Sequence, residues 1–503
     1  MTKEEAGGCR GAHPRKQVPT LRPMINRPPN LLVIMSDEHA PQFSGFGGHP
    51  LVQTPNLDRL AASGVHFTNA YCASPLCTPS RMSFMTGRHV HRNPGGWDNT
   101  SHLSRDVATW AHAVRAVGYD CVLAGKQHFP DPQYLHGFRA QLAFDLHASQ
   151  THGQADWSRG VPVAAQPWPG VTQAGPGRTR ELDVDDGVTQ AAVRYITEMR
   201  GEERPWAMDV GYIAPHFPLI APQRFWDVYD TETIDLPVIP PGHLAALPPA
   251  MHRMRAAFGL ADFSDDEVRR ARHGYYALCT YLDEQVGILL GALEATGQLQ
   301  DTVVIYTSDH GEMAGEHGMW RKSNFYEQSV RVPLIMSWPG ALPSGREVVH
   351  PVSHVDVVAS ILDLAGADHL PGMDGTSLLP LARDNHGAAE SWAGEVFAEY
   401  LAHGVASPVA MLRHGPYKLI YALDDPPVLF DLEDDPGEFR DFAGDPAHAE
   451  VLSDMRARLF RRWNPTEVDL AVRQHQAERL LIHRALYGET GPASFAHVGG
   501  GTQ

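Results

Sequence analysis

The sequence contains little cysteine and no long apolar run. Its 503 residues include five cysteines, an odd and sparse set that does not predict a disulfide framework. No segment reaches the length needed to cross a bilayer. Residues 1–28 are polar and proline-bearing, without the apolar stretch of a signal peptide. We therefore expect a cytoplasmic protein that does not bind membranes.

Basic residues are also scarce. Lysine and arginine together number 41, against 59 aspartates and glutamates, so the formal net charge is −18. This balance argues against nucleic acid as a partner. An anionic substrate would have to be attracted by a local cluster of positive side chains, because the overall field repels it. The hydrophobic content of 43% is enough for one large core and a smaller second one.

Four apolar segments end abruptly at ionisable side chains. Their near-continuous aliphatic composition is typical of strands covered on both faces, as in a parallel sheet. In such sheets functional groups collect at the carboxyl ends of the strands, so the side chains that follow are predicted to share one site. The segments are 31–35, followed by Asp37 and Glu38; 121–124, followed by Lys126 and His128; 206–213, followed by His216; and 302–306, followed by Asp309 and His310.

Helical segments alternate with these strands. Ser264 and Glu267 predict a capping box at the start of a helix that ends at Gly297. Further helices are predicted to open at Pro55 and to cover residues 106–117. The alternation extends over roughly 350 residues and predicts an α/β fold with a large, mostly parallel sheet flanked by helices.

The segment from about residue 385 onward changes character. Short strands separated by turns predict a small antiparallel sheet, and a helix over residues 446–463 with a polar tail follows. The predicted strands lie at 411–413, 417–421 and 428–432. The predicted division is a polar tail over 1–28, an α/β domain over 29–384, and a C-terminal subdomain over 385–503.

One motif combines a cysteine, a proline and an arginine at fixed steps. Residues 76–87 read Leu-Cys-Thr-Pro-Ser-Arg-Met-Ser-Phe-Met-Thr-Gly. Pro79 suits the first position of a helix, because proline has no amide hydrogen to lose there, and Arg81 lies four residues after Cys77. A thiol at the positive end of a helix beside a guanidinium is suited to anionic chemistry. The alternative, a buried cysteine before a proline-capped helix, does not explain the whole motif.

The spelling Cys-x-Pro-Ser-Arg, followed by Thr86 and Gly87, resembles the signature of the type I sulfatases, in the alkaline phosphatase superfamily. In that family a formylglycine-generating enzyme oxidises the cysteine to formylglycine, whose hydrated aldehyde attacks sulfate esters. The resemblance covers most of the chain and is closest to the choline-sulfatase-like enzymes. It implies an alkaline-phosphatase-like catalytic domain followed by a small antiparallel sheet with a helix. It is carried further by residues 71–77, 97–99, 125–129 and 135–138.

The resemblance implies one divalent metal ion, held by residues from distant parts of the chain. Carboxylate oxygens favour a hard cation, with Ca²⁺ as the first expectation and Mn²⁺ or Mg²⁺ as alternatives. Glu38 departs from the commoner Asp or Gln, which leaves its ligation and the identity of the metal open. A lone Asp-Glu pair after a strand would indicate a helix N-cap, but its pairing with Asp309 and His310 argues against this. The expected ligands are Asp37, Glu38, the converted Cys77, Asp309 and His310.

Positive side chains are expected around the transferring sulfuryl group, where preorganised charge stabilises the transition state. Lys322 lies in residues 318–327, which resemble the family stretch Gly-x-Trp-x-Lys-x-x-x-Tyr/Phe-Glu. His216 and Lys322 are both candidates for protonating the leaving oxygen, and the sequence does not choose between them. Asn99 is expected to hydrogen-bond the sulfate. The expected catalytic residues are Cys77, Arg81, Lys126, His128, His216 and Lys322.

The function expected from the resemblance is hydrolysis of a small alkyl or aryl sulfate ester. Choline-O-sulfate is included but not favoured, because the chain near residues 493–497 lacks the aromatic and acidic side chains that would hold its ammonium group. A phosphonate monoester or phosphodiester hydrolase with the same nucleophile and metal is the alternative. A non-catalytic binding protein is disfavoured, because no expected catalytic position is replaced by an inert residue. The sequence leaves a homo-oligomer open. Candidates to line an organic pocket, beside the more general expectation of core packing, are Trp97, Phe129, Trp157 and Trp168.

Overall fold

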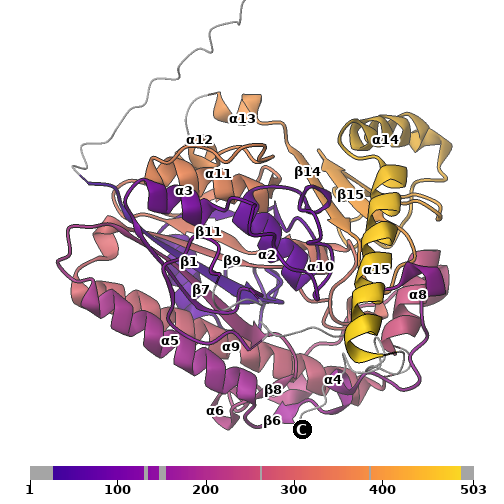
Figure 1. Ribbon diagram of the computed structural model, residues 1–503. Helices are drawn as coiled ribbons and strands as arrows, with labels where there is room; N and C mark the ends of the chain where they lie inside the picture. The colour runs from indigo at the N-terminus through magenta and orange to yellow at the C-terminus, as the bar shows by residue number, and fades with distance from the viewer. Residues whose placement is uncertain (1–26, 130–133, 147–154, 261–262, 384–386, 489–503) are drawn as a thin grey trace, which may run out of the picture.

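The computed structural model describes five stretches of the chain (Figure 1). The N-terminal tail predicted over residues 1–28, apart from its last two residues, lies outside them, as do residues 493–497. The division between residues 384 and 385 remains a prediction, because residues 384–386 are also outside. The described stretches are 27–129, 134–146, 155–260, 263–383 and 387–488.

An eight-stranded, mostly parallel sheet forms the centre of the molecule (Figure 1), which confirms the predicted α/β fold. The four strands predicted to end in ionisable side chains are neighbours in its middle and all run parallel, in the order β9, β1, β7, β4. Only β11 runs antiparallel to its neighbours β9 and β2. In spatial order the strands are β12 (Arg346–Val348), β2 (Val65–Phe67), β11 (Leu334–Ser337), β9 (Thr302–Ser308), β1 (Asn30–Asp37), β7 (Trp206–Pro215), β4 (Asp120–Gly125) and β5 (Ala140–Gln141).

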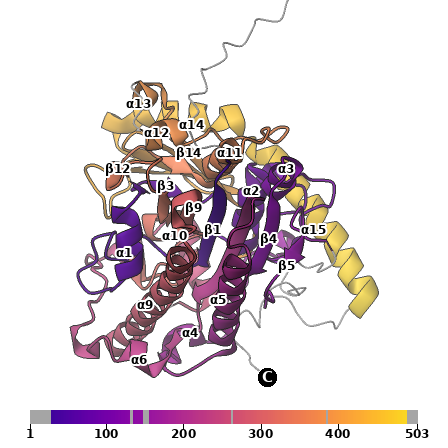
Figure 2. The same cartoon turned by 90° about the vertical axis from the view of Figure 1, so that its left-hand side faces the viewer.

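Helices cover both faces of this sheet (Figures 1 and 2). On one face α5 and α9 pack against β7, with α1 against α9, while α2, α3 and α11 pack together on the other. Every residue of β1 is buried as a result. Each large aliphatic side chain removed from water in this way contributes roughly 1.5–3 kcal/mol. These helices are α1 (Pro55–Ala62), α2 (Cys77–Thr86), α3 (Trp110–Ala116), α5 (Arg180–Glu198), α9 (Asp265–Thr296) and α11 (His354–Ala365).

The starts of three helices show how local chemistry sets helix boundaries. The capping box predicted for α9 is present, with Ser264 Oγ accepting the N–H of Glu267 at 3.3 Å. Helix α3 begins later than predicted, because Thr109 rather than a residue near 106 forms its capping box. Helix α2 begins at Cys77, so the prediction that Pro79 occupies its first position is wrong. Proline is still tolerated there, because the first four amides of a helix have no intrahelical acceptor.

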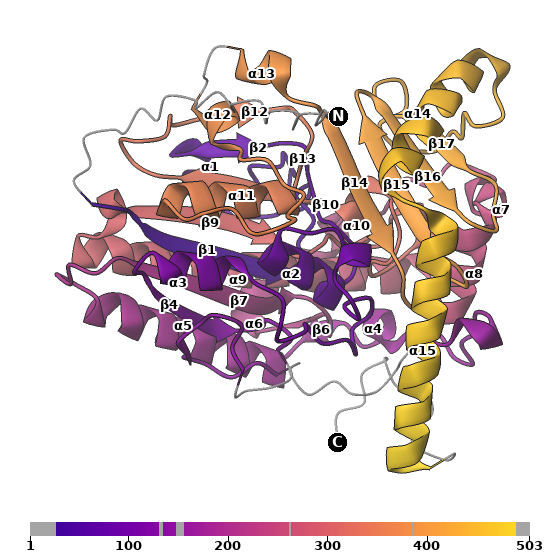
Figure 3. The same ribbon diagram turned by 45° about the horizontal axis from the view of Figure 1, so that its top comes forward.

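A small antiparallel sheet lies beside one end of the large sheet (Figure 3), as predicted. Its first strand, β14, was not predicted, and helix α14 (Ala449–Arg462) packs against β15 and β16. The strands pair in chain order with their neighbours. They are β14 (Glu395–Tyr400), β15 (Val409–His414), β16 (Tyr417–Ala422) and β17 (Val428–Asp431).

The prediction of a polar tail after residue 463 is wrong for roughly the first half of that segment. Residues Pro465–Tyr487 form a long helix, α15, which runs past the end of the large sheet (Figure 3). Asn464 caps it by accepting the N–H groups of Thr466 and Glu467. The helix looks polar in sequence because it buries only a narrow face, which includes Val468 and Val472.

A buried group of charges joins the small sheet to the large domain. Glu327 accepts a hydrogen bond from Lys418 of β16 at 2.8 Å and another from Tyr71 at 2.9 Å. Lys418 also pairs with Glu438. Removing one partner of such a buried group typically costs about 3–5 kcal/mol, because it leaves an uncompensated charge. The stretch that carries Lys322 is therefore anchored at its end by the C-terminal sheet.

Shorter elements complete the fold. Among the described residues no helix combines the length and the apolar character needed to span a bilayer. The remaining strands are β3 (Ala70–Tyr71), β10 (Arg331–Val332) and β13 (Val352–Ser353) in one sheet, and β6 (Gly175–Pro176) with β8 (Ile220–Ala221) in another. The short helices are α4 (Pro169–Thr172), α6 (Gln223–Trp226), α7 (His243–Ala246), α8 (Pro249–Phe258), α10 (Glu327–Val330), α12 (Leu379–Ala382) and α13 (Ala388–Ser391).

Candidate active site

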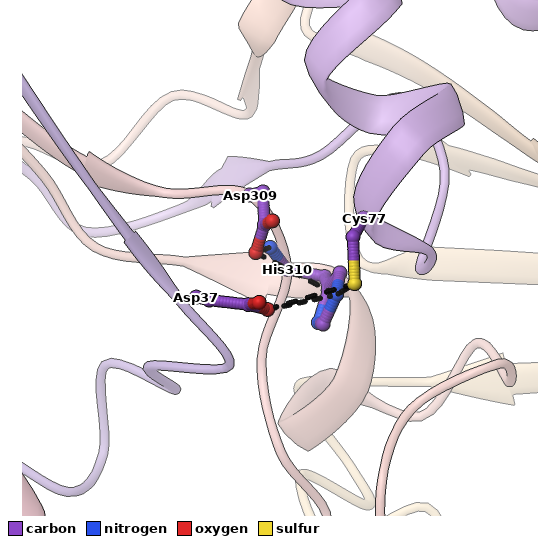
Figure 4. Close-up of side chains that lie close together, drawn as sticks. All are labelled: Asp37, Cys77, Asp309 and His310. Carbon is purple, nitrogen blue, oxygen red and sulfur yellow. Dashed lines mark hydrogen bonds and ion pairs between the residues drawn. The ribbon is translucent and has the colours of Figure 1, made fainter. Parts of the chain in front are cut away.

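The ends of two central strands and the start of α2 meet at one buried group of side chains (Figure 4). Asp37 is the last residue of β1, Asp309 and His310 directly follow β9, and Cys77 is the first residue of α2. The possible ligand atoms of these four residues all lie within 4.8 Å of one another. The structure thus brings together residues that are up to 273 positions apart, from Asp37 to His310.

The sulfur of Cys77 is in contact with this group. His310 Nε2 lies 3.2 Å from Sγ, and Sγ lies 3.7 Å from Asp37 Oδ1. Burial raises the pKa of the Cys77 thiol to about 11, although the nearby Lys322 opposes the shift. The encoded side chain is therefore a neutral thiol at pH 7, which is a poor nucleophile.

Arg81 connects Asp309 to two neighbouring backbone segments by hydrogen bonds. Its Nε donates to Asp309 Oδ2 at 2.8 Å, and its two terminal nitrogens donate to the backbone carbonyls of Lys126, at 2.6 Å, and Ser36, at 3.2 Å. Both side chains of the Arg81–Asp309 pair are 0% exposed. Burial alone would raise the pKa of Asp309, but interaction with His310 and Arg81 holds it well below its ordinary value. Asp309 is therefore a carboxylate throughout the neutral range.

Two buried lysines form ion pairs with carboxylates at the site. Lys126 pairs with Asp37, and Lys322 pairs with Glu38. Burial lowers the pKa of Lys126 to about 8. Burial also acts against the charged form of Lys322, but Cys77 and Glu38 more than compensate and raise its pKa. Both lysines carry a positive charge at pH 7, where they can attract an anionic group.

Glu38 belongs to a second, overlapping group rather than to the first. Asp37, Glu38 and His216 offer ligand atoms within 4.8 Å of one another, and His216 Nε2 lies 3.7 Å from Glu38 Oε1. Glu38 has a positive φ of 64°, an unusual conformation for a residue other than glycine. Such strain costs of order 1–3 kcal/mol and is concentrated at functional sites.

Asn99 and His128 are placed differently. Asn99 Oδ1 accepts the N–H of Thr78 at 3.0 Å, and its Nδ2 lies 3.9 Å from Cys77 Sγ, so it faces the group. The backbone N–H of His128 donates to Asp145 at 2.7 Å, just beyond Lys126. No hydrogen bond between described residues joins the His128 side chain to Cys77, and its role remains a prediction.

The four-residue group suits a divalent metal ion. Asp37 and Asp309 supply carboxylate oxygens, the ligands that hard cations prefer. Burial lowers the pKa of His310 to about 3, so its imidazole is neutral and has a lone pair to offer. An oxygen in place of the Cys77 sulfur would make the donor set one of oxygens and one nitrogen, which fits Ca²⁺, Mn²⁺ or Mg²⁺ better than a thiolate does.

Most of the chain matches known protein families. Residues 29–367 match the sulfatase family, and residues 315–464 match the C-terminal region of N-sulphoglucosamine sulphohydrolase. The chain belongs to the sulfatase family. Both the family resemblance and the sulfuric-ester hydrolase activity that it implies are therefore confirmed.

Individual relatives cover nearly the whole sulfatase. It is 34% identical over 485 residues to a choline-sulfatase of Rhizobium meliloti, covering 92% of both chains. It is 30% identical over 484 residues to arylsulfatase K of Danio rerio, covering 92% of this chain and 89% of the relative. Its fold is similar to that of a phosphonate monoester hydrolase from Silicibacter pomeroyi, with a TM-score of 0.72, 27% identity, and coverage of 86% and 95%.

The sequence analysis missed the contribution of α15 to the site of this sulfatase. Arg479 donates to Asp98 Oδ1 at 3.1 Å and to the carbonyl of Thr100 at 2.6 Å, on either side of Asn99. His475 packs edge-on against Trp97, with ring centroids 5.2 Å apart. No local signal could have shown this, because Arg479 and Asp98 are 381 positions apart. Helix α15 therefore holds the loop that carries Asn99.

We expect Arg479→Met to lower kcat/KM by about 10- to 100-fold, because a small displacement of a positioned group has effects of that size. The loss should be non-additive with Asn99→Ala, since Arg479 acts through the loop that holds Asn99. Steady-state kinetics of the two single variants and the double variant measure this. Arg484→Met, on the exposed end of the same helix, is the control. Fully additive losses would show that Arg479 does not act through Asn99.

Proposed function

We propose that this sulfatase hydrolyses the sulfate ester of a small alkyl or aryl alcohol, using a formylglycine made from Cys77 and one divalent metal ion. The observation that carries the proposal is the buried group of Asp37, Cys77, Asp309 and His310, within 4.8 Å. Ca²⁺ is the first expectation for the metal, with Mn²⁺ or Mg²⁺ as alternatives. Maturation would require a formylglycine-generating enzyme as a partner.

When bound, the metal would polarise the sulfate, and formylglycine would supply the attacking oxygen. The chain's own residues supply the remaining requirements. Lys126 and Lys322 provide positive charge beside Cys77, where negative charge develops on the sulfuryl oxygens. Asn99 offers an amide N–H, with its Nδ2 3.9 Å from Cys77 Sγ. Arg81 keeps Asp309 ionised and fixed in place.

The leaving oxygen needs a proton, for which His216 and Lys322 are the candidates. Lys322 has a raised pKa and a carboxylate partner, so it gives up its proton less readily. His216 lies at the half-buried edge of the site, with a side chain 11% exposed, where solvent can restore a proton. This favours His216 as the general acid.

A second candidate function is hydrolysis of a phosphonate monoester or phosphodiester. It is favoured by the structural similarity to a phosphonate monoester hydrolase. Like a sulfate monoester, these substrates carry a single negative charge, and the same lysines could attract them. The two functions differ in the reacting group and not in the residues that surround it.

The test begins with the modification. After co-expression with a formylglycine-generating enzyme, mass spectrometry of the Cys77 peptide should show the thiol replaced by an aldehyde. The converted protein is then assayed with 4-nitrophenyl sulfate, 4-nitrophenyl phenylphosphonate and bis(4-nitrophenyl) phosphate under one metal. We expect the highest kcat/KM with the sulfate. A wholly unmodified thiol, or a higher kcat/KM with either phosphorus ester, would contradict the proposal.

Removal of the metal should also abolish turnover. Because the sulfate and the nucleophile would lose the cation that polarises and orients them, we expect exhaustive treatment with a chelator to lower activity by at least about 100-fold. Addition of Ca²⁺, Mn²⁺ or Mg²⁺ in turn should restore it and identify the preferred ion. Metal content measured in parallel connects the loss to the ion. An enzyme that keeps its rate without metal would refute the proposed ligand set.

A further inference from the structure

One buried arginine near the site forms no ion pair with any residue that the structure describes. Among the described residues, the buried arginines are Arg81, Arg272 and Arg321. Arg81 pairs with Asp309, and Arg272 pairs with Asp235 and Glu316. Arg321 is 6% exposed, yet within the described part of the chain its guanidinium forms no ion pair and no hydrogen bond. Arginine is almost never buried in this way unless it is paired.

Three aromatic rings surround this guanidinium instead. The distances from Arg321 Cζ to the ring centroids are 4.9 Å for Phe217, 5.0 Å for Phe258 and 5.5 Å for Trp168. Such contacts stabilise a cation, but they satisfy none of its N–H groups. The donors of the guanidinium therefore remain available for an acceptor that none of the described residues supplies.

The backbone of Arg321 is held firmly. Its N–H donates to Glu312 Oε1 at 2.6 Å, and its carbonyl accepts the N–H of Met313 at 2.8 Å. Its φ is positive, at 69°. The positive φ and the two backbone hydrogen bonds fix the direction in which the side chain leaves the backbone, toward the three aromatic rings. The position of the guanidinium is therefore preorganised.

Arg321 lies next to Lys322 and near Cys77. Phe217 contacts both Arg321 and Lys322, whose Nζ lies 5.3 Å from the same ring centroid. Burial lowers the pKa of Arg321, while its electrostatic interactions with Glu38, Glu312, Tyr400 and Cys77 raise it. Glu38 is paired with Lys322, and Glu312 Oε1 accepts the backbone N–H groups of Ala314 and Arg321, so neither carboxyl group forms an ion pair with the Arg321 guanidinium. Within the described part of the chain, the Lys322 ammonium group thus has a carboxylate partner and the neighbouring Arg321 guanidinium has none.

We propose that Arg321 recognises a carboxylate on the substrate, so that the preferred substrate is a sulfate ester whose alcohol part also bears a carboxylate. This inference depends on the proposed function for the sulfate end of the molecule. A carboxylate can accept two parallel N–H bonds from the edge of a guanidinium whose faces contact aromatic rings. Its binding would neutralise the unpaired buried charge.

The same geometry argues against a cationic substrate. The ring box of Trp168, Phe217 and Phe258 could hold a quaternary ammonium group, but it is filled by the chain's own guanidinium. A second cation next to Arg321 would be repelled in this buried setting. Choline-O-sulfate should therefore be a poor substrate, even though a choline-sulfatase is among the relatives.

The first test is a binding measurement that needs no turnover. Cys77→Ala protein, which cannot form formylglycine, is titrated by calorimetry in the presence of Ca²⁺ with 3- and 4-(sulfooxy)benzoate and with the matching uncharged benzamides. We expect one benzoate to bind about 10- to 100-fold more tightly than its benzamide, the usual effect of a buried charge-assisted hydrogen bond. Equal affinities, or no binding of either ligand, would overturn the inference.

The second test assigns the preference to Arg321. In the same background, Arg321→Met should reduce the benzoate-to-benzamide affinity ratio to about 1. Arg321→Lys should leave an intermediate ratio, because lysine keeps the positive charge but lacks the planar guanidinium that can donate two parallel N–H bonds to a carboxylate. Arg440→Met, which removes an exposed guanidinium 4.3 Å from the Phe442 ring centroid, is the matched control. If Arg321→Met weakens both ligands equally, Arg321 binds the sulfate itself and the inference is wrong.

Turnover by the converted enzyme separates this inference from the proposed function. Preferential hydrolysis of the carboxylated ester would support both. Hydrolysis of the benzoate and benzamide esters at equal kcat/KM would leave the sulfatase function standing and refute the role of Arg321. If the benzoate binds preferentially but no sulfate ester is hydrolysed by protein with confirmed formylglycine, the inference holds and the proposed function fails.

Discussion

Cys77→Ala should abolish sulfate ester hydrolysis while leaving the protein folded. We expect kcat to fall by at least about 10³-fold, since removal of a nucleophile typically eliminates most of the catalysis. The side chain removed is small, so the free energy of unfolding should fall by only about 1 kcal/mol. Initial rates with 4-nitrophenyl sulfate and a urea unfolding curve measure the two effects.

The matched control for this variant is Cys279→Ala. Cys279 is also buried and free, but it lies in the middle of α9, within the apolar core. If Cys279→Ala shows a similar small loss of stability but keeps full activity, the loss of activity in Cys77→Ala results from the missing reactive group and not from destabilisation. Activity retained in Cys77→Ala would rule out the nucleophile assignment, whatever the mass spectrum shows.

Arg81→Met should remove both activity and stability. Arg81 supplies hydrogen bonds to the Asp309 carboxylate and to two buried backbone carbonyls, and methionine can replace none of them. Breaking a buried pair by removing one partner typically costs about 3–5 kcal/mol. We also expect kcat/KM to fall by at least about 100-fold, because Asp309 loses the group that orients it. Urea unfolding and kinetics on the folded protein measure these losses.

Arg272→Met separates the two effects of this change. Arg272 is also buried and paired, with Asp235 and Glu316, but no hydrogen bond or ion pair joins it to Cys77 or Asp309. It should lose a comparable amount of stability and retain most of its kcat/KM when folded. If Arg81→Met and Arg272→Met lose activity in equal proportion, Arg81 contributes only to folding. The role of Arg81 in orienting Asp309 would then be refuted.

The sequence predicted the central strands well because their signal is local. Each of β1, β4, β7 and β9 combines a short apolar run with an abrupt polar end. A near-continuous apolar run of this length is typical of a parallel strand that is buried on both faces. The capping box of α9 was equally readable, since all its chemistry lies within four residues. The error at α2 was small, because proline is tolerated throughout the first turn of a helix.

The error at α15 was larger and has a physical reason. A helix that buries only a narrow face has a mixed composition, and its apolar positions are too few to distinguish it from a tail. What stabilises α15 is contact with segments far away in sequence, such as the bond from Arg479 to Asp98. Tertiary packing of this kind supplies most helical stability in proteins.

The sequence by itself determined the family and the strand ends and supplied the prediction that Cys77 is the reactive position, because each depends on residues close together in the chain. The tertiary structure decided which charges are neutralised. Glu38 pairs with Lys322, Asp309 pairs with Arg81, and the Arg321 guanidinium is enclosed by aromatic rings and forms no ion pair with any described residue. Burial makes an unpaired charge expensive, so the pairing of charges, on which the proposed substrate preference depends, is decided by the fold and not by the motif.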